Sequence, residues 1–226
     1  MPRDTYFQKP SGPAILQMGK ARMHAPPSNP RGVLSDGAGQ FRISVKSPDV
    51  RNFIAGDCIA SVRWTADDDL MIVKRLKIGY VCTVAFTTPQ LVDVGLYIAR
   101  NFQVSDLGGS VIVPSVPNTG ELDSRAGPSA IAQNNGRIAS LTPVSAGVRT
   151  LSAHPFMSVT GFPTATAGVV SDQQVEWTFG DTASAYPIVL RCNEGIVVNL
   201  LTAMGAAGRM AFYFEIEWDE ISGNRN

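Results

Sequence analysis

The feature that most constrains the fold is a regular alternation of apolar and polar side chains close to the C-terminus. Apolar side chains occupy every second position of one stretch: Met210, Phe212, Phe214, Ile216 and Trp218. The positions that point the other way carry Tyr213, Glu215, Glu217 and Asp219. Successive side chains of a strand lie on opposite faces of a sheet, so this stretch has one buried and one solvated face. It predicts a long, half-buried β-strand.

Three further stretches alternate in the same way. Residues 58–64 place Cys58, Ala60, Val62 and Trp64 on one face. Residues 76–86 place Leu76, Ile78, Tyr80, Cys82, Val84 and Phe86 on one face. In residues 91–105 one face holds Val92, Val94, Leu96 and Ile98 and continues to Phe102 and Val104. Each stretch predicts a strand with one face in the core.

Shorter strand candidates occupy residues 41–46, 137–141, 148–152, 174–179, 186–192 and 195–202. Turn-forming clusters separate them, as at Asn193-Glu-Gly195. Many short strands at regular spacing, without an amphipathic helix or a repeat, predict an all-β protein, a jelly-roll-like antiparallel β-sandwich. Residues 113–135 and 160–186 are rich in small residues and predict long loops that suit contacts between subunits.

The N-terminal part of the sequence differs from the rest. Residues 1–40 contain six prolines: Pro2, Pro10, Pro13, Pro26, Pro27 and Pro30. Proline fixes φ and lacks an amide donor, so this part forms neither a regular helix nor a central strand. We therefore divide the chain into an extended N-terminal arm, residues 1–46, and a β-sandwich domain, residues 47–226.

The formal net charge of zero hides an uneven distribution. Residues 1–46 carry seven basic and two acidic side chains, a net charge of +5, so the remaining residues carry −5. The basic residues of the arm never cluster, which disfavours nucleic acid as its partner. Opposite charges on arm and body favour contacts between subunits, for which the candidate residues are Arg3, Lys9, Lys20, Arg22 and Arg31.

Cysteine usage and hydropathy indicate where the protein is made. Cys58, Cys82 and Cys192 are odd in number and widely spaced, which predicts free thiols rather than disulfides or zinc ligands. No stretch resembles a signal peptide or a membrane span. We expect synthesis in the host cytoplasm and no contact with a membrane.

Few residues are candidates for chemistry. His24 lies in the arm and His154 precedes Pro155, and no Gly-x-Ser-x-Gly sequence accompanies them. We interpret His154 as a loop or core residue. The acidic cluster Asp67-Asp-Asp69 lacks the EF-hand spacing, which favours a solvated turn over a calcium site. We expect no metal ion, no cofactor and no small-molecule substrate.

Glu215, Glu217 and Asp219 resemble the carboxylate row of a glycoside hydrolase. The exposed face of an edge-facing strand carries the same pattern, because acidic side chains there block edge pairing. We expect this structural role, and therefore no enzyme activity. The aromatic candidates for a sugar-binding platform are Trp64, Trp177 and Trp218, of which we expect Trp64 and Trp218 in the core.

Two stretches resemble virion proteins of tailed bacteriophages. The residues from Pro187 to Ile221 resemble a closing hairpin with an Asn-Glu-Gly bulge, a small-residue loop and a terminal strand ending in Glu-Trp. The residues from Leu91 to Asp106 are similar to the same group. Together they cover under a quarter of the chain. The resemblance implies a jelly-roll-like structural protein of the virion, such as a decoration or cement protein of the capsid, without catalytic residues.

From these features we expect a structural protein of a bacteriophage virion, a decoration or cement protein that stabilises the shell through oligomerisation and arm-mediated contacts. The expected partners are further copies of the chain, as a homotrimer, and the major capsid protein. Three alternatives stay open. They are a tail or head-fibre component, a jelly-roll coat protein whose arm contacts the genome, and a carbohydrate-binding β-sandwich.

Overall fold

A computed structural model describes residues 40–112, 135–162, 172–179 and 186–222. Every regular element in these residues is a β-strand. None of them forms a helix long and apolar enough to cross a membrane. Residues 1–39 of the predicted arm lie outside the described part of the chain, whereas its last seven residues form the first strand, β1 (Gln40–Lys46).

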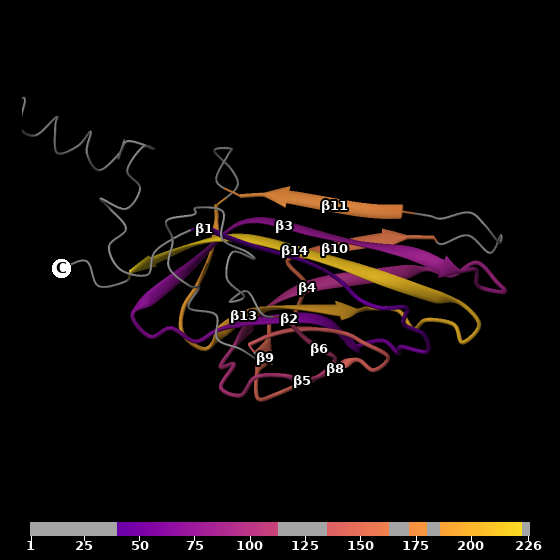
Figure 1. Ribbon diagram of the computed structural model, residues 1–226, viewed down its shortest axis with the longest axis horizontal. Helices are drawn as coiled ribbons and strands as arrows, with labels where there is room; N and C mark the ends of the chain where they lie inside the picture. The colour runs from indigo at the N-terminus through magenta and orange to yellow at the C-terminus, as the bar shows by residue number, and fades with distance from the viewer. Residues whose placement is uncertain (1–39, 113–134, 163–171, 180–185, 223–226) are drawn as a thin grey trace, which may run out of the picture.

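The strands form two stacked antiparallel sheets (Figure 1). The five-stranded sheet has the order β1, β14 (Arg209–Ser222), β3 (Asp69–Val84) and β11 (Asp172–Thr178), with β12 (Ile188–Leu190) also paired to β3. The nine-stranded sheet has the order β10 (Met157–Gly161), β4 (Val92–Arg100), β13 (Glu194–Leu200), β2 (Cys58–Trp64), β7 (Gly136–Ile138) and β6 (Ser110–Ile112). The predicted all-β antiparallel sandwich is confirmed.

Three very short strands complete the nine-stranded sheet. They are β5 (Leu107–Gly108), β8 (Val144–Ser145) and β9 (Thr150–Leu151). β5 pairs with β8, while β8 and β9 pair with the larger strands β2 and β4. With their connecting residues 101–109 and 140–152 they lie below β13 and β2 in Figure 1, and we call these residues the lower layer.

The main core lies between the two sheets. The alternating apolar residues of β14 all point into it, and Trp218 is 1% exposed. Its ring stacks on Phe41 of β1, with ring centroids 5.6 Å apart. Trp64 of the opposite sheet is also buried, and its Nε1 donates a hydrogen bond to the carbonyl of Asp69 (2.9 Å). Burial of such large aromatic side chains is a main source of stability in a sandwich.

Two residues, Phe102 and Cys58, lie on the opposite face of the sheet from the one that their sequence pattern predicts. Asn101 has a left-handed backbone (φ 50°), which ends the alternation of β4 and turns Phe102 to the opposite side of the sheet. In β13, Asn199 pairs with Cys58 and its neighbour Val198 pairs with Ala60. β2 therefore contains one extra residue, Ile59, at this bulge. Phe102 and Cys58 therefore join a second apolar cluster beneath the nine-stranded sheet. Val104, expected on the same buried face, is exposed.

Candidate functional site: the charged outer face of the five-stranded sheet

The alternation of side chains in β14 places the row of carboxylates on the outer face of the five-stranded sheet. Glu215, Glu217 and Asp219 point away from the main core, opposite to the apolar side chains of β14. β14, however, lies between β1 and β3, and the stretch Tyr213–Asp219 that carries the row is paired on both sides. The expectation of an edge-facing strand is therefore wrong, and the acidic side chains do not serve to block edge pairing. They face basic residues of the two neighbouring strands.

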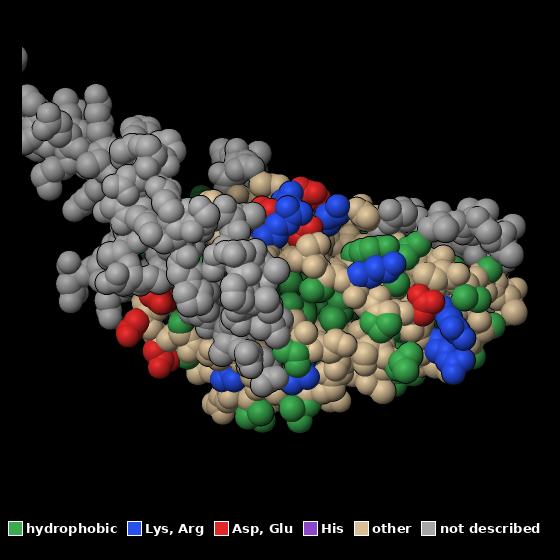
Figure 2. All heavy atoms as spheres, viewed as in Figure 1, with side chains coloured by type: hydrophobic (Ala, Val, Ile, Leu, Met, Phe, Trp, Pro, Cys, Tyr) green, Lys and Arg blue, Asp and Glu red, His purple; other side chains and the backbone are tan. Residues whose placement is uncertain are grey.

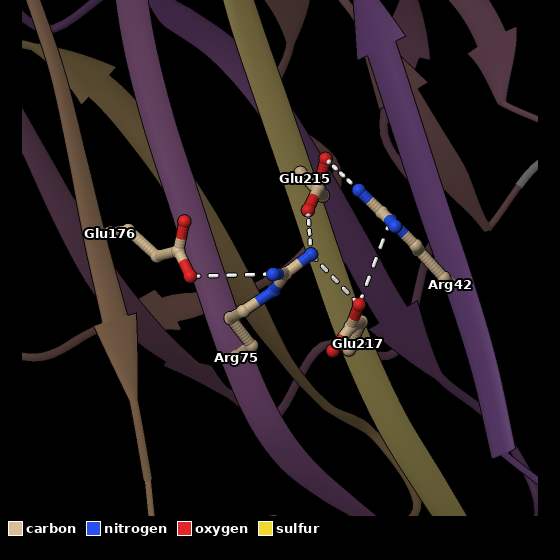
Figure 3. A network of polar contacts seen from close by, with 5 residues as sticks. All are labelled: Arg42, Arg75, Glu176, Glu215 and Glu217. Carbon is tan, nitrogen blue, oxygen red and sulfur yellow. Dashed lines mark hydrogen bonds and ion pairs between the residues drawn. The ribbon is translucent and has the colours of Figure 1, made fainter.

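Five of these charged side chains form a network across four strands (Figure 3). Arg42 of β1 contacts Glu215 (Nη2–Oε2, 2.8 Å) and Glu217 (Nε–Oε1, 3.6 Å). Arg75 of β3 contacts Glu217 (Nη2–Oε1, 2.8 Å), Glu215, and Glu176 of β11 (Nη1–Oε1, 3.3 Å). Each arginine thus bridges at least two carboxylates, which ties β1, β14, β3 and β11 together on the outer face.

The register of the sheet explains why these residues meet. Glu217 lies directly opposite Arg42 on one side and directly opposite Arg75 on the other. Opposite charges at such cross-strand positions stabilise a sheet. A further pair, Lys74 with Asp219 (Nζ–Oδ2, 3.1 Å), follows on the same face. Lys74 occupies the extra position of a bulge in β3, between the pairs Glu217–Arg75 and Trp218–Val73.

The environment of Glu215 keeps its carboxylate ionised. Burial alone would raise the pKa of this group, because desolvation disfavours the charge. The hydrogen bond and the positive charge of Arg42, followed by the charge of Arg75, outweigh that effect and lower the pKa below its ordinary value of 4.5. The same hydrogen bond raises the pKa of Arg42. The general acid of a glycoside hydrolase needs a raised pKa, so Glu215 is unsuited to that role.

Replacing Glu215 with glutamine is expected to lower the free energy of unfolding at pH 7 by about 1–2 kcal/mol, the range for hydrogen bonds to partly screened charged groups. The folded-state pKa lies below the unfolded value, so the stabilisation is present above that value and is lost as pH falls through the folded pKa. The difference between the two proteins should therefore shrink in acid.

Urea unfolding at pH 7 and at pH 3 measures both effects. The matched control is Glu176→Gln, which removes a more exposed carboxylate of the same network and should change stability by less than about 0.5 kcal/mol. An equal effect of the two substitutions, or a Glu215→Gln difference that persists unchanged at pH 3, contradicts the assignment.

The other candidates for chemistry lie apart from this network. His154 is exposed in the connection between β9 and β10. Asp67 and Asp68 are exposed in the turn before β3, as predicted for a solvated turn. Among the described residues no group of three or more His, Cys, Asp or Glu side chains is arranged to hold a metal ion. His24 and the arm residues Arg3, Lys9, Lys20, Arg22 and Arg31 lie outside the described residues.

An open hollow of about 450 Å³ lies beside the turn between β12 and β13. It is lined by Arg100, Asn101, Gln103, Arg191, Cys192, Asn193 and Glu194. The Cys192 thiol donates a hydrogen bond to Asp67 (Sγ–Oδ1, 2.8 Å), and this bond raises the pKa of Cys192. A thiol reacts as its thiolate, so this arrangement makes Cys192 a weak nucleophile. Cys58 and Cys82 are free and buried, and burial raises the pKa of Cys58 to about 11.

The tryptophans do not form an exposed row for sugars. Trp64 and Trp218 lie in the main core, as predicted. Trp177 on β11 is half-buried and packs against the same core. A sugar platform needs an exposed ring face, which Trp64 and Trp218 lack because both are fully buried.

Pairing of the acidic row with Arg42 and Arg75 went unpredicted. The sequence does indicate that both arginines lie on the solvated face of their strands, because each occupies a polar position of an alternating stretch. A second unpredicted feature is the ion pair of Asp106 and Arg149 inside the lower layer, with side chains 0% and 5% exposed. Nothing in their spacing along the sequence indicates it.

Comparison with known proteins adds little to this geometry. No protein-family model matches the chain, and no curated protein matches it. A chain from the structure of infectious bursal disease virus Gt strain is similar at 14% identity and a TM-score of 0.17. The alignment covers 84% of this chain but 43% of that one, so this chain spans less than half of its length. A likeness at this level carries no argument about function.

Proposed function

We propose that the protein is a structural component of a bacteriophage virion, a decoration or cement protein that stabilises the capsid shell. The observation that carries this proposal is the charge network on the outer face of the five-stranded sheet. Its carboxylates are held by Arg42 and Arg75 of adjacent strands. These ion pairs therefore stabilise the five-stranded sheet. Carboxylates that are engaged in this way favour a structural role over glycoside hydrolysis.

The proposed partners are further copies of the chain, assembled as a homotrimer, and the major capsid protein. Residues 1–39, the part of the arm that precedes β1, carry a net charge of +3 and the remaining residues −3, so the arm of one copy and the body of another attract each other. The arm residues proposed for these contacts are Arg3, Lys9, Lys20, Arg22 and Arg31. Many weak contacts repeated by symmetry add up to tight attachment.

Deletion of residues 1–39 tests the arm. The truncation ends one residue before β1, so we expect the sandwich to keep its circular dichroism spectrum and its melting temperature. Binding to particles that lack the protein should weaken by about 100-fold, because a second attachment point is lost. Sedimentation of the labelled protein with such particles measures the affinity.

The matched control replaces the five basic arm residues with glutamine and keeps the length of the arm. This variant should lose most of the same affinity if charge carries the contact. Unchanged binding and unchanged particle stability after truncation contradict the role of the arm. A changed nucleic-acid content of the particles would instead support the coat-protein alternative.

A further inference from the structure

The five-stranded sheet ends in two unpaired edges. β1 forms one edge and β11 forms the other, and neither has a second strand beside it in the part of the chain that the structure describes. Both strands have seven residues, contain no proline or glycine, and pair with their inner neighbours without a bulge. A straight edge of this kind presents a row of backbone amides and carbonyls, with which a further strand can pair.

The hydrogen bonds on the inner side of each edge identify the backbone groups that point outward. Just beyond β1, the amide of Ser47 donates to the carbonyl of Phe212 (2.8 Å). Just beyond β11, the amide of Phe179 donates to the carbonyl of Lys74 (2.7 Å). Alternate residues of a strand in an antiparallel sheet bond to opposite sides. The residues whose backbone groups point outward therefore include Arg42, Ser44 and Lys46 in β1, and Glu176 and Thr178 in β11.

The charges on the outer face of the sheet alternate in sign from strand to strand. Figure 3 shows the order: Arg42 of β1, Glu215 and Glu217 of β14, Arg75 of β3, and Glu176 of β11. Acidic and basic side chains lie side by side in the upper part of Figure 2, at the level of β3 and β11 in Figure 1. The two end members, Arg42 and Glu176, have side chains 41% and 44% exposed, against at most 24% for the other three. A second copy beside either edge would continue the alternation.

The apolar inner faces of the two edges are incompletely covered. Val45 of β1, and Val175 and Trp177 of β11, pack against the main core but are only half-buried. A strand beside each edge would cover more of these side chains, and burial of apolar area stabilises association. Each edge therefore offers a joining strand a charged outer side and an apolar inner side.

We propose that β1 of one copy pairs with β11 of the next copy, with Arg42 opposite Glu176, so that the five-stranded sheets of the copies join into a closed ring. β1 and β11 run in opposite directions, so copies that stand side by side in the same orientation form an antiparallel pair. A contact between two different edges is head-to-tail, and the smallest ring that such contacts close has three copies. The inference rests on the proposed function, which includes a homotrimer, and it identifies the strands that join the copies.

Charge opposes the pairing of like edges. Two β1 strands would bring Arg42 and Lys46 of one copy beside the same residues of the other, and two β11 strands would bring Glu176 beside Glu176. Like charges at cross-strand positions destabilise a sheet, whereas opposite charges stabilise it. Residues 1–39, with a net charge of +3, are likewise a poor match for the basic edge of β1. The complementary occupant is the β11 edge of another copy.

Proline substitution tests each edge separately. Ser44→Pro removes an outward amide of β1, and Thr178→Pro removes an outward amide of β11; both residues are exposed. Proline is accepted in an edge strand but breaks the pairing of a central strand. Light scattering after size-exclusion chromatography should find the intact protein as a trimer and each variant alone as a monomer, because the dissociation constant rises at least about 100-fold.

Mixing the two variants distinguishes unlike edges from like edges. The Thr178→Pro copy keeps its β1 edge and the Ser44→Pro copy keeps its β11 edge, so an equimolar mixture should form dimers with one copy of each. The controls Ser44→Ala and Thr178→Ala lose the same side chains but keep the amides, and they should remain trimers. Glu176→Gln keeps every amide and should raise the dissociation constant about two- to fivefold. Circular dichroism and thermal melting check that each variant is folded.

The inference is overturned if the intact protein is a monomer at all concentrations, if either folded proline variant alone self-associates, or if the two folded variants do not associate when mixed. Should a proline variant fail to fold, an unchanged dissociation constant for Glu176→Gln overturns it. Its failure can be told apart from failure of the proposed function. Variants that complement each other in a protein absent from virions support the edge pairing and contradict the virion role. A protein that is present in virions and whose oligomer survives both proline substitutions does the reverse.

Discussion

Replacing Asp106 with alanine is expected to destabilise the folded protein by about 3–5 kcal/mol, the usual cost of leaving one member of a buried ion pair without its partner. The Asp106 side chain is completely buried and Arg149 is 5% exposed. The substitution removes the counter-ion of Arg149 and the acceptor for the Gly147 amide. Arg149 would then remain as a buried charge beneath the nine-stranded sheet, beside the Phe102 ring and the Cys58 thiol.

The matched control removes both charges through the double replacement Asp106→Leu and Arg149→Met. Apolar replacement of both partners of a buried pair is often nearly neutral, so the double variant should be more stable than Asp106→Ala. Urea unfolding at pH 7, followed by circular dichroism, gives both free energies. A loss below about 1 kcal/mol for Asp106→Ala would contradict a desolvated pair, because that is the range of exposed ion pairs.

Replacing Trp218 with alanine should cost a similar amount, about 3–5 kcal/mol. Its ring is 1% exposed, stacks on Phe41, and donates a hydrogen bond from Nε1 to Glu220 (3.0 Å). Alanine would leave a large cavity where β1 and β14 meet the main core. The loss should also loosen β1, because the ring of Phe41 would lose its stacking partner.

Trp218→Phe is the control that keeps an aromatic ring and removes the indole donor. It should cost clearly less than alanine, since most of the buried apolar volume is retained. Amide hydrogen exchange can follow β1 separately, and faster exchange of Ile43 in the alanine variant is the expected result. A cost below about 1 kcal/mol for alanine would mean that Trp218 is not in the core.

The long strands could be predicted wherever a strand has one buried and one solvated face. The range 58–64 coincides with β2, and residues 210–218 lie within β14. Alternation reports which side of a strand is buried but not which strands lie beside it. For this reason Glu215 and Glu217 could be placed on a solvated face, while their pairing with arginines of β1 and β3 depended on the sheet order.

Most of the lower layer could not be predicted, for three physical reasons, and among its strands only β9 overlaps a predicted stretch, residues 148–152. β5, β8 and β9 have two residues each, too few to show any period. The contacts that hold the layer also join residues far apart in the chain, such as Asp106 with Arg149. A single backbone angle, φ 50° at Asn101, decides that Phe102 packs below the nine-stranded sheet. Side-chain periodicity carries no information about such an angle.

The copy number of this chain in purified phage particles tests a structural role in the virion most directly. Quantitative mass spectrometry gives its ratio to the major capsid protein, and electron cryomicroscopy gives its position. We expect a fixed ratio, many copies per particle, and density on the shell surface grouped around symmetry axes. Particles that lack the chain, or that carry it in small and variable amounts, would contradict the proposed role.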